Sequence, residues 1–179
     1  SIILPVCLML SMLTGVTAEE APKVGGAGAT VPFTTYQAES GESNGVKTPD
    51  SLTGEVSAGQ AYIQLVNQGD YITLKDMKAG NRLVVRYGIP QGDPDRTLSV
   101  YVTDVKKGTL TLTSAQCYDL DNHPRRYDEK FMEVDSPEGA SVTLKKDSGD
   151  DAAWYAIDLI DVETAEAPLT KSASYLYIT

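Results

Sequence analysis

The strongest constraint on the fold is a regular series of short apolar runs separated by turn residues. Within these runs apolar and polar side chains alternate, as they do from Leu98 to Val102. Alternation with a period of two places successive side chains on opposite faces of a strand. The turns between the runs each contain glycine, usually beside Asn, Asp, Pro or Lys. Because no useful helical period appears, the sequence predicts an all-β fold.

The predicted strands are joined mostly by short turns. Their alternation is typical of antiparallel strands that have one face toward the solvent. This pattern favours an antiparallel β-sandwich, specifically a jelly roll. Residues 40–60 form a longer polar connection after the first strand. The predicted strands are residues 33–39, 61–66, 71–75, 82–89, 98–103, 109–113, 130–134, 141–145 and 154–163.

The 179 residues are enough for one domain with tails at both ends. Residues 1–18 are predominantly apolar and end in Val16-Thr17-Ala18, which predicts a secretory signal peptide whose charged start is missing. A membrane anchor is the alternative, although the apolar run is short for a span. Residues 19–31 are predicted to be a linker and 32–164 the sandwich. Residues 165–179 are predicted to be a second linker and the start of a further, truncated domain. The expected location is secreted or at the cell surface.

Charge and composition exclude several classes of function. The formal net charge of -10 leaves no basic patch for nucleic acid, and it disfavours an anionic membrane once the signal is removed. Cys117 would be the one cysteine left, so no internal disulfide is expected, and it is interpreted as a buried apolar residue. The only histidine, His123, is expected in a loop, which argues against a catalytic triad or a His-rich metal site.

The last predicted strand contains a carboxylate, Asp158, in its middle. Alternation places Asp158 on the same face as Ala156, Ile160 and Val162, with Ile157 and Leu159 on the other. A strand that is apolar on both faces is normally buried, and a buried carboxylate is costly unless something binds it. Asp158 is therefore expected to have a partner, which is a cation, a basic side chain or backbone donors.

Four motifs, in this order and at these intervals, resemble carbohydrate-binding modules of the family 6 and family 35 type. The resemblance covers residues 33–163. It implies a galactose-binding-like jelly roll that is not itself catalytic. Such a module binds a polysaccharide or oligosaccharide and targets an appended C-terminal glycoside hydrolase to its substrate. The motifs are Tyr36-Gln37-Ala38-Glu39, Gly69-Asp70-Tyr71-Ile72, Arg82-Leu83-Val84-Val85-Arg86-Tyr87 and Ile157-Asp158-Leu159-Ile160.

The resemblance also implies a structural calcium ion, held at the positions of Gln37, Glu39 and Asp158. On one strand Gln37 and Glu39 would project on the same side, about 7 Å apart. Calcium takes six to eight oxygen ligands from carboxylates, amides and backbone, which these residues can supply. The alternative is that Asp158 only accepts hydrogen bonds.

Sugar binding requires an aromatic face against the apolar side of a sugar ring. The resemblance assigns this role to Tyr62 and Tyr127. The family has a sugar-binding Asn where this sequence has Ala156, so Trp154 and Tyr155 are candidates to replace that contact. The alternative is that all four aromatic residues belong to the core.

Two other functions remain open. The segment can itself be part of a polysaccharide-degrading enzyme that uses paired carboxylates, or a cell-surface adhesion or protein-interaction sandwich. The acidic residues available for catalysis are Asp119, Asp121, Asp128, Glu129, Asp150, Asp151, Asp161 and Glu163.

Overall fold

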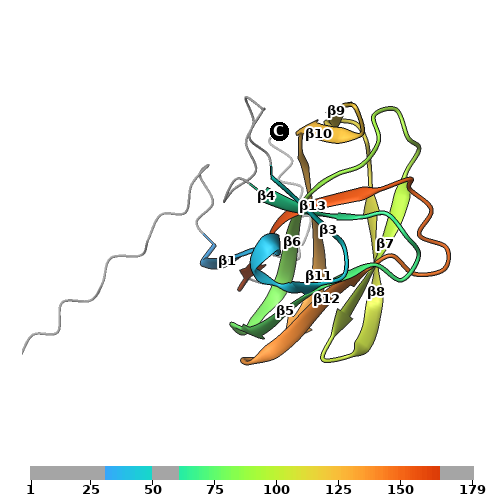
Figure 1. The fold of residues 1–179 in the computed structure, drawn as a ribbon. Coiled ribbons are helices and arrows are strands. Elements are labelled where there is room, and N and C mark those ends of the chain that lie inside the picture. The colour runs from blue at the N-terminus through green and yellow to red at the C-terminus, as the bar shows by residue number, and fades with distance from the viewer. Residues whose placement is uncertain (1–30, 50–60, 166–179) are drawn as a thin grey trace, which may run out of the picture.

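The computed structural model describes residues 31–49 and 61–165, which form two layers of antiparallel sheet (Figure 1). In this part of the chain the one helix is the 3₁₀ turn η2 (Ala38–Ser40), so the predicted all-β fold is confirmed. The predicted signal peptide lies outside the described residues, as do nearly all of the first linker and of the C-terminal segment. No described helix has the length and apolar character needed to cross a membrane.

The first sheet is built around the last strand, β13 (Tyr155–Glu163). One edge of β13 pairs with β6, and the other edge pairs first with β4 and then with β1. Strands β11 and β3 complete the outer positions. Because β13 has neighbours on both edges, its apolar composition is explained by burial. The other strands of this sheet are β1 (Phe33–Gln37), β3 (Val46–Pro49), β4 (Ala61–Leu65), β6 (Gly80–Gly88) and β11 (Asp128–Ser136).

The second sheet has the order β2-β5-β12-β7-β8. Its strands are β2 (Glu42–Ser43), β5 (Tyr71–Met77), β7 (Arg96–Val102), β8 (Val105–Leu112) and β12 (Ala140–Lys145). Strands β7 and β8 are joined by Thr103 and Asp104, whose φ angles are 47° and 64°. Two successive residues with positive φ form the turn whose twist matches a two-residue hairpin.

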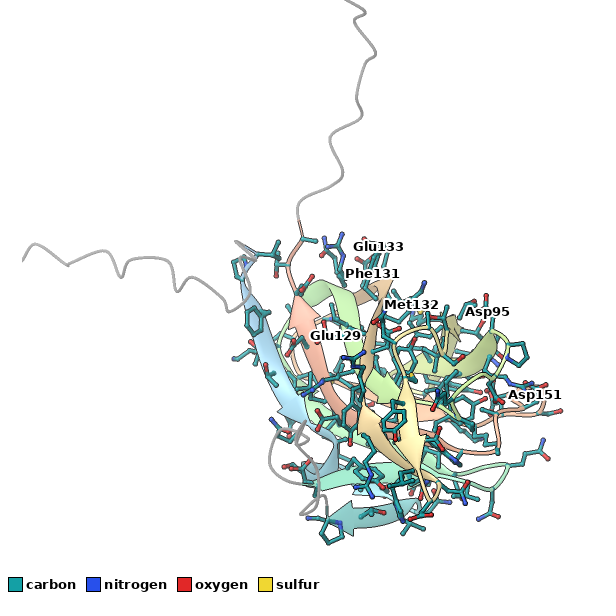
Figure 2. All side chains as sticks on the ribbon, turned by 90° about the horizontal axis from the view of Figure 1, so that it is seen from above. Asp95, Glu129, Phe131, Met132, Glu133 and Asp151 are labelled. Carbon is teal, nitrogen blue, oxygen red and sulfur yellow. The ribbon has the colours of Figure 1, made fainter. Side chains whose placement is uncertain are left out.

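The main apolar core lies between the sheets. Leu65, Leu83 and Ile157 enter it from the first sheet, and Ile72 and Leu144 from the second. On β11 the alternation is regular: Glu129, Phe131 and Glu133 are exposed on the outer side (Figure 2). The Arg82 guanidinium lies over the Phe131 ring. All nine predicted strands are present among the described residues.

Two parts of the fold differ from the sequence prediction. Strands β2 and β3 form within the predicted polar connection, and β9 (Tyr118–Leu120) and β10 (His123–Arg126) form a hairpin where a polar loop including His123 was expected. These strands are short, and they lack apolar alternation. Asp121 and Asn122, with φ angles of 56° and 60°, make the two-residue turn of the β9–β10 hairpin.

Asp158 lies at a β-bulge, where the register between β13 and β6 shifts between Ile157 and Leu159. The bulge changes the phase of the alternation, so Ile157, Ile160 and Val162 all enter the main core. The expectation that Asp158 shares a face with Ile160 and Val162 is therefore wrong. An extra residue in a strand is not visible in a simple period of two.

Candidate functional site

The buried carboxylate of Asp158 has a basic partner. Asp158 is 0% exposed, and Arg86 of β6 donates a hydrogen bond from Nη1 to its Oδ2 over 2.9 Å. The Arg86 guanidinium also lies over the Tyr127 ring, 5.0 Å from its centroid. Of the partners considered from the sequence, a basic side chain is thus present.

The two other predicted calcium ligands lie where the chain leaves β1. Gln37 is the last residue of β1, opposite Leu159 of β13, and Glu39 belongs to η2. Gln37 Oε1 and Glu39 Oε2 are buried, and neither has a hydrogen-bond partner among the described residues. The described part of the chain contains no group of three His, Cys, Asp or Glu side chains placed to hold a metal. A calcium ion here would therefore depend on amide and backbone oxygens as well as carboxylates.

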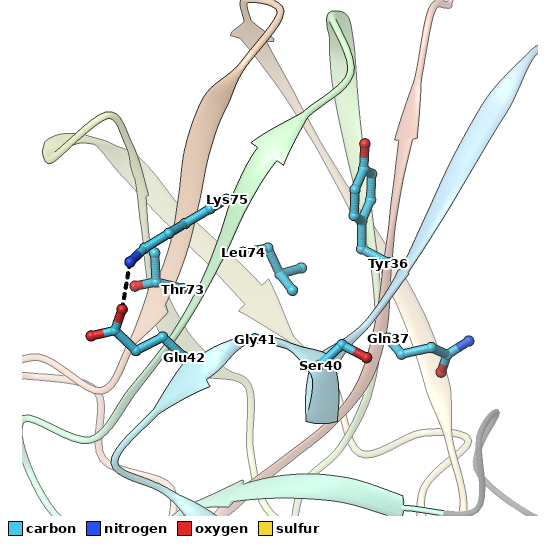
Figure 3. A pocket seen from close by; sticks show the side chains of 8 residues that line it. All are labelled: Tyr36, Gln37, Ser40, Gly41, Glu42, Thr73, Leu74 and Lys75. Carbon is cyan, nitrogen blue, oxygen red and sulfur yellow. Dashed lines mark hydrogen bonds and ion pairs between the residues drawn. The ribbon is translucent and has the colours of Figure 1, made fainter.

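A pocket of about 270 Å³ lies beside the same turn (Figure 3). Lys75 and Glu42 form an ion pair of 2.6 Å there, and both side chains are exposed. This contact holds the pKa of Glu42 below its ordinary value and that of Lys75 above it. The pocket is lined by Tyr36, Gln37, Ser40, Gly41, Glu42, Thr73, Leu74 and Lys75.

Three of the four aromatic residues predicted to bind sugar are brought together. Tyr62, Tyr127 and Trp154 form a second small apolar cluster with Ala156, and the two tyrosine rings meet edge to face at 6.4 Å. All three are buried, with exposed fractions of 1%, 7% and 4%. The fourth, Tyr155, is buried in the main core. Sugar binding by these residues stays a prediction, and their burial argues against it because no ring face is open.

The β9–β10 hairpin is anchored beside this aromatic cluster. Tyr62 Oη lies 2.7 Å from His123 Nδ1, and Gln64 Nε2 donates to the Asn122 carbonyl over 3.0 Å. Gly88 of β6 leaves room for the hairpin, since a Cβ atom there would lie 2.9 Å from Pro124 Cβ. His123 is therefore a docking residue of the hairpin.

A groove runs between the hairpin and the turn that follows β8. We call it the hairpin groove. Its larger part has a volume of about 610 Å³, and an adjoining part of about 350 Å³ shares Gln116 and Arg126 with it. Tyr118 is 48% exposed at this groove. The larger part is lined by Gln91, Ala115, Gln116, Cys117, Tyr118, Arg125 and Arg126, and the smaller by Arg86, Gln116, Arg126, Tyr127, Asp128 and Glu129.

Of the residues that line the groove, the sequence interpretation selected Tyr127 for sugar binding and listed Asp128 and Glu129 as acidic candidates, but it did not select Tyr118, Gln91 or Gln116. The one available signal was Asp121-Asn122 between Leu120 and His123, a dipeptide suited to a two-residue hairpin turn. Recognising that turn would have placed Tyr118 and Arg125 on paired strands.

The wall of the groove that follows β8 is fixed by a buried tyrosine. Tyr87 Oη donates to the Thr113 carbonyl over 2.9 Å and accepts from the Thr113 amide over 3.0 Å. Burial raises the pKa of Tyr87 to about 12. Burial also raises the pKa of the Cys117 thiol, so Cys117 is a buried apolar residue, as expected, and not an activated nucleophile.

A protein-family model described as alpha-1,3-glucanase catalytic domain D1 matches residues 30–165. The matched range includes both sheets, the hairpin and the groove. No curated protein sequence matches the chain.

Solved structures of alpha-1,3-glucanases are similar to the chain. The catalytic unit of the thermostable GH87 alpha-1,3-glucanase from Streptomyces thermodiastaticus strain HF3-3 is 29% identical, with a TM-score of 0.67 over 80% of this chain and 28% of that chain. The catalytic domain of a GH87 alpha-1,3-glucanase in complex with tetrasaccharides is 24% identical, with a TM-score of 0.67 over 79% of this chain and 30% of that one. The chain thus spans less than a third of the length of these enzymes.

A more distant structure supports the fold alone. It is an exo-beta-1,3-galactanase from Phanerochaete chrysosporium in complex with beta-1,3-galactotriose. It is 19% identical, with a TM-score of 0.56 over 73% of this chain and 29% of that one.

These matches correct the functional interpretation of the sequence. The assignment to carbohydrate-binding modules of family 6 or 35 is wrong, and so is the expectation of a non-catalytic module outside the enzyme's catalytic domain. The separately appended C-terminal glycoside hydrolase has no support once that assignment is withdrawn. The open alternative, a part of a polysaccharide-degrading enzyme, agrees with the findings. Because the family model covers most of its length, the chain belongs to the alpha-1,3-glucanase catalytic domain D1 family.

Proposed function

We propose that the chain is the D1 part of a glycoside hydrolase that cleaves α-1,3-glucan. The observation that carries this proposal is the family match over residues 30–165. The similarity to the S. thermodiastaticus catalytic unit, at 29% identity, supports it. The formal net charge of -10 agrees with a neutral polysaccharide as the substrate.

Several acidic residues once considered for catalysis have structural contacts. Asp161 accepts a hydrogen bond from Thr35, Glu163 pairs with Arg82, and Asp150 accepts from the amide and hydroxyl of Ser99. These contacts favour a structural role for the three carboxylates.

The test is hydrolysis by the enzyme that contains this chain. Release of reducing sugar would be measured on α-1,3-glucan, with β-1,3-glucan and β-1,3-galactan as matched substrates that differ in anomer or sugar. We expect release from α-1,3-glucan only. Cleavage of either β-linked polymer without cleavage of α-1,3-glucan would refute the proposal.

We also propose that calcium binds at Gln37, Glu39 and Asp158. The support is the pair of buried oxygens, Gln37 Oε1 and Glu39 Oε2, that have no hydrogen-bond donor among the described residues. Burying such atoms without a partner is costly, and a hard cation would compensate for it. Calcium bound to the folded state alone raises the melting temperature. We expect chelator to lower that temperature, added Ca²⁺ to restore it, and Glu39→Gln to weaken the response. A melting temperature insensitive to chelator would contradict the site.

Two finer predictions remain proposals. A jelly-roll connection is supported by the way consecutive strands β4, β5, β6 and β7 alternate between the two sheets. Secretion rests on the apolar composition of residues 1–18.

A further inference from the structure

The hairpin groove has two walls that are held in place by the fold. The β9–β10 hairpin is anchored through His123 to Tyr62 and through Asn122 to Gln64. The opposite wall is anchored by Tyr87 at Thr113, and Ser114 Oγ donates to the Asp93 carbonyl over 2.7 Å. A site with fixed walls loses little conformational entropy when a ligand binds.

Polar groups without internal partners line the groove. Arg125 Nε is buried and has no hydrogen-bond partner within the described ranges. The side-chain amides of Gln91 and Gln116 likewise bond to none of the residues that the structure describes, although the Gln91 backbone amide donates to Asp119. Guanidinium groups are donors only, whereas amides both donate and accept, so together they match the mixed hydroxyls of a sugar.

Tyr118 adds the apolar component. Its ring is half-exposed at the same groove, so it can face the C–H side of a pyranose. The volume of about 610 Å³ falls within the range of small-molecule sites, roughly 300–1,000 Å³. An exposed aromatic ring beside guanidinium and amide groups suits a carbohydrate better than an apolar ligand.

Charged residues of both signs line the groove. Arg125 and Arg126 line its larger part, and the adjoining part adds Asp128, Glu129 and Arg86, whose guanidinium is paired with the buried Asp158. The whole chain carries a formal charge of -10, which opposes the approach of an anionic polymer.

We infer that the hairpin groove binds a short stretch of neutral glucan, with Tyr118 stacking on a sugar ring and Arg125, Gln91 and Gln116 bonding to its hydroxyls. The identity of the sugar as α-1,3-linked glucose rests on the proposed function. The groove would hold the polysaccharide chain on D1, which is a role beyond hydrolysis.

The direct test measures binding of the 179-residue chain to α-1,3-linked glucose oligosaccharides by calorimetry. Tyr118→Ala is expected to weaken binding by about three- to tenfold, because one aromatic contact is lost. Arg125→Ala and Gln116→Ala should also weaken binding. The matched controls are Phe131→Ala, an exposed aromatic residue on β11, and Lys107→Ala, which removes one exposed positive charge from β8. Both controls should bind as the unmodified chain does.

Three results would overturn the inference. They are a chain that binds no neutral oligosaccharide, groove variants that keep full affinity while melting normally, and tighter binding of uronic-acid oligosaccharides than of neutral ones. Tyr118→Phe keeps the ring and should retain most of the affinity, which separates stacking from a general effect of substitution.

A second measurement distinguishes this inference from the proposed function. In the enzyme that contains the chain, groove variants should raise KM on polymeric α-1,3-glucan and leave kcat unchanged. If these variants hydrolyse α-1,3-glucan with an unaltered KM, the inference that the groove binds glucan is wrong, but the proposed hydrolase function still stands. If the enzyme does not hydrolyse α-1,3-glucan but the chain binds another neutral glycan through Tyr118, the proposed function is wrong and the groove is still a carbohydrate-binding site.

Discussion

Single residues show how the first sheet accommodates charge in its interior. Asp158 is completely buried, whereas the side chain of its partner Arg86 is 25% exposed. Arg86 can therefore reach solvent if the pair is broken, but Asp158 cannot. The two members of the ion pair should consequently differ in what their removal costs.

We predict that Arg86→Ala destabilises the chain by about 3–5 kcal/mol, because it leaves the buried Asp158 carboxylate without its guanidinium partner. It also removes the contact with the Tyr127 ring. Asp158→Ala should cost less, since the remaining guanidinium is partly solvated. The free energy of unfolding, measured in urea with a chelator present so that loss of a calcium ligand does not enter the comparison, gives both values. Glu42→Ala, which breaks an exposed ion pair, serves as the control and should change little. Equal losses for Arg86→Ala and Asp158→Ala would contradict the asymmetry.

The sequence predicted that Asp158 is buried and needs a partner, but it did not identify Arg86. The two residues are 72 positions apart, and the bulge between Ile157 and Leu159 determines how their strands meet. The bulge depends on how β13 pairs with β6, and the sequence pattern of one strand carries no information about that pairing.

At the level of elements, the β9–β10 hairpin decides how the aromatic residues are used. The hairpin is anchored to Tyr62 through His123, and its Pro124 packs beside Gly88. It therefore covers the aromatic surface that was expected to be open to a sugar. The larger strands were predictable because each has an apolar face directed to the main core. The hairpin has no such face, and its position follows from tertiary contacts.

We predict that Tyr62→Phe loosens the hairpin while leaving the sandwich folded. The substitution removes the hydrogen bond between Tyr62 Oη and His123 Nδ1, which is worth roughly 0.5–1.5 kcal/mol. Amide hydrogen exchange should become faster for residues 118–126 and stay unchanged in β7 and β12. Tyr71→Phe is the matched control, because its hydroxyl makes only a long, exposed hydrogen bond to Glu42. Unchanged exchange in the hairpin would show that other contacts hold it.

For the whole molecule, the resemblance motifs mark contacts that stabilise the two sheets, and they did not identify the family. Asp70 of the Gly-Asp motif accepts hydrogen bonds from the Val66 and Asn67 amides, and Arg86 and Asp158 form the buried pair. These contacts build a sandwich, and similar sandwiches serve unrelated functions. The fold class was therefore predictable from strand patterning, whereas the family required comparison over the full length.

Two buried tyrosines link the sheets and make the sandwich sensitive to alkali. Tyr155 Oη, from the first sheet, donates to the Thr97 carbonyl of β7 in the second, and Tyr87 Oη bonds to Thr113 just after β8. Burial raises the pKa of each hydroxyl to about 12. In the unfolded chain a tyrosine titrates at roughly pH 10.

We predict that stability falls steeply between about pH 10 and pH 12. Each folded-state pKa lies above its unfolded value, so the stabilising contribution is complete below pH 10 and is lost as pH rises toward 12. Melting temperatures recorded across this range should decline less steeply for Tyr87→Phe than for the unmodified chain, although the variant starts lower because Thr113 loses both hydrogen bonds. Tyr118→Phe, at an exposed position, should keep the original slope. The tyrosinate absorbance of the buried Tyr87 and Tyr155 should rise only as the chain unfolds. The absorbance of exposed tyrosines should rise at a lower pH, before unfolding begins. If Tyr87→Phe does not change how steeply the melting temperature falls with pH, the loss of stability at alkaline pH is caused by charge repulsion within the acidic chain.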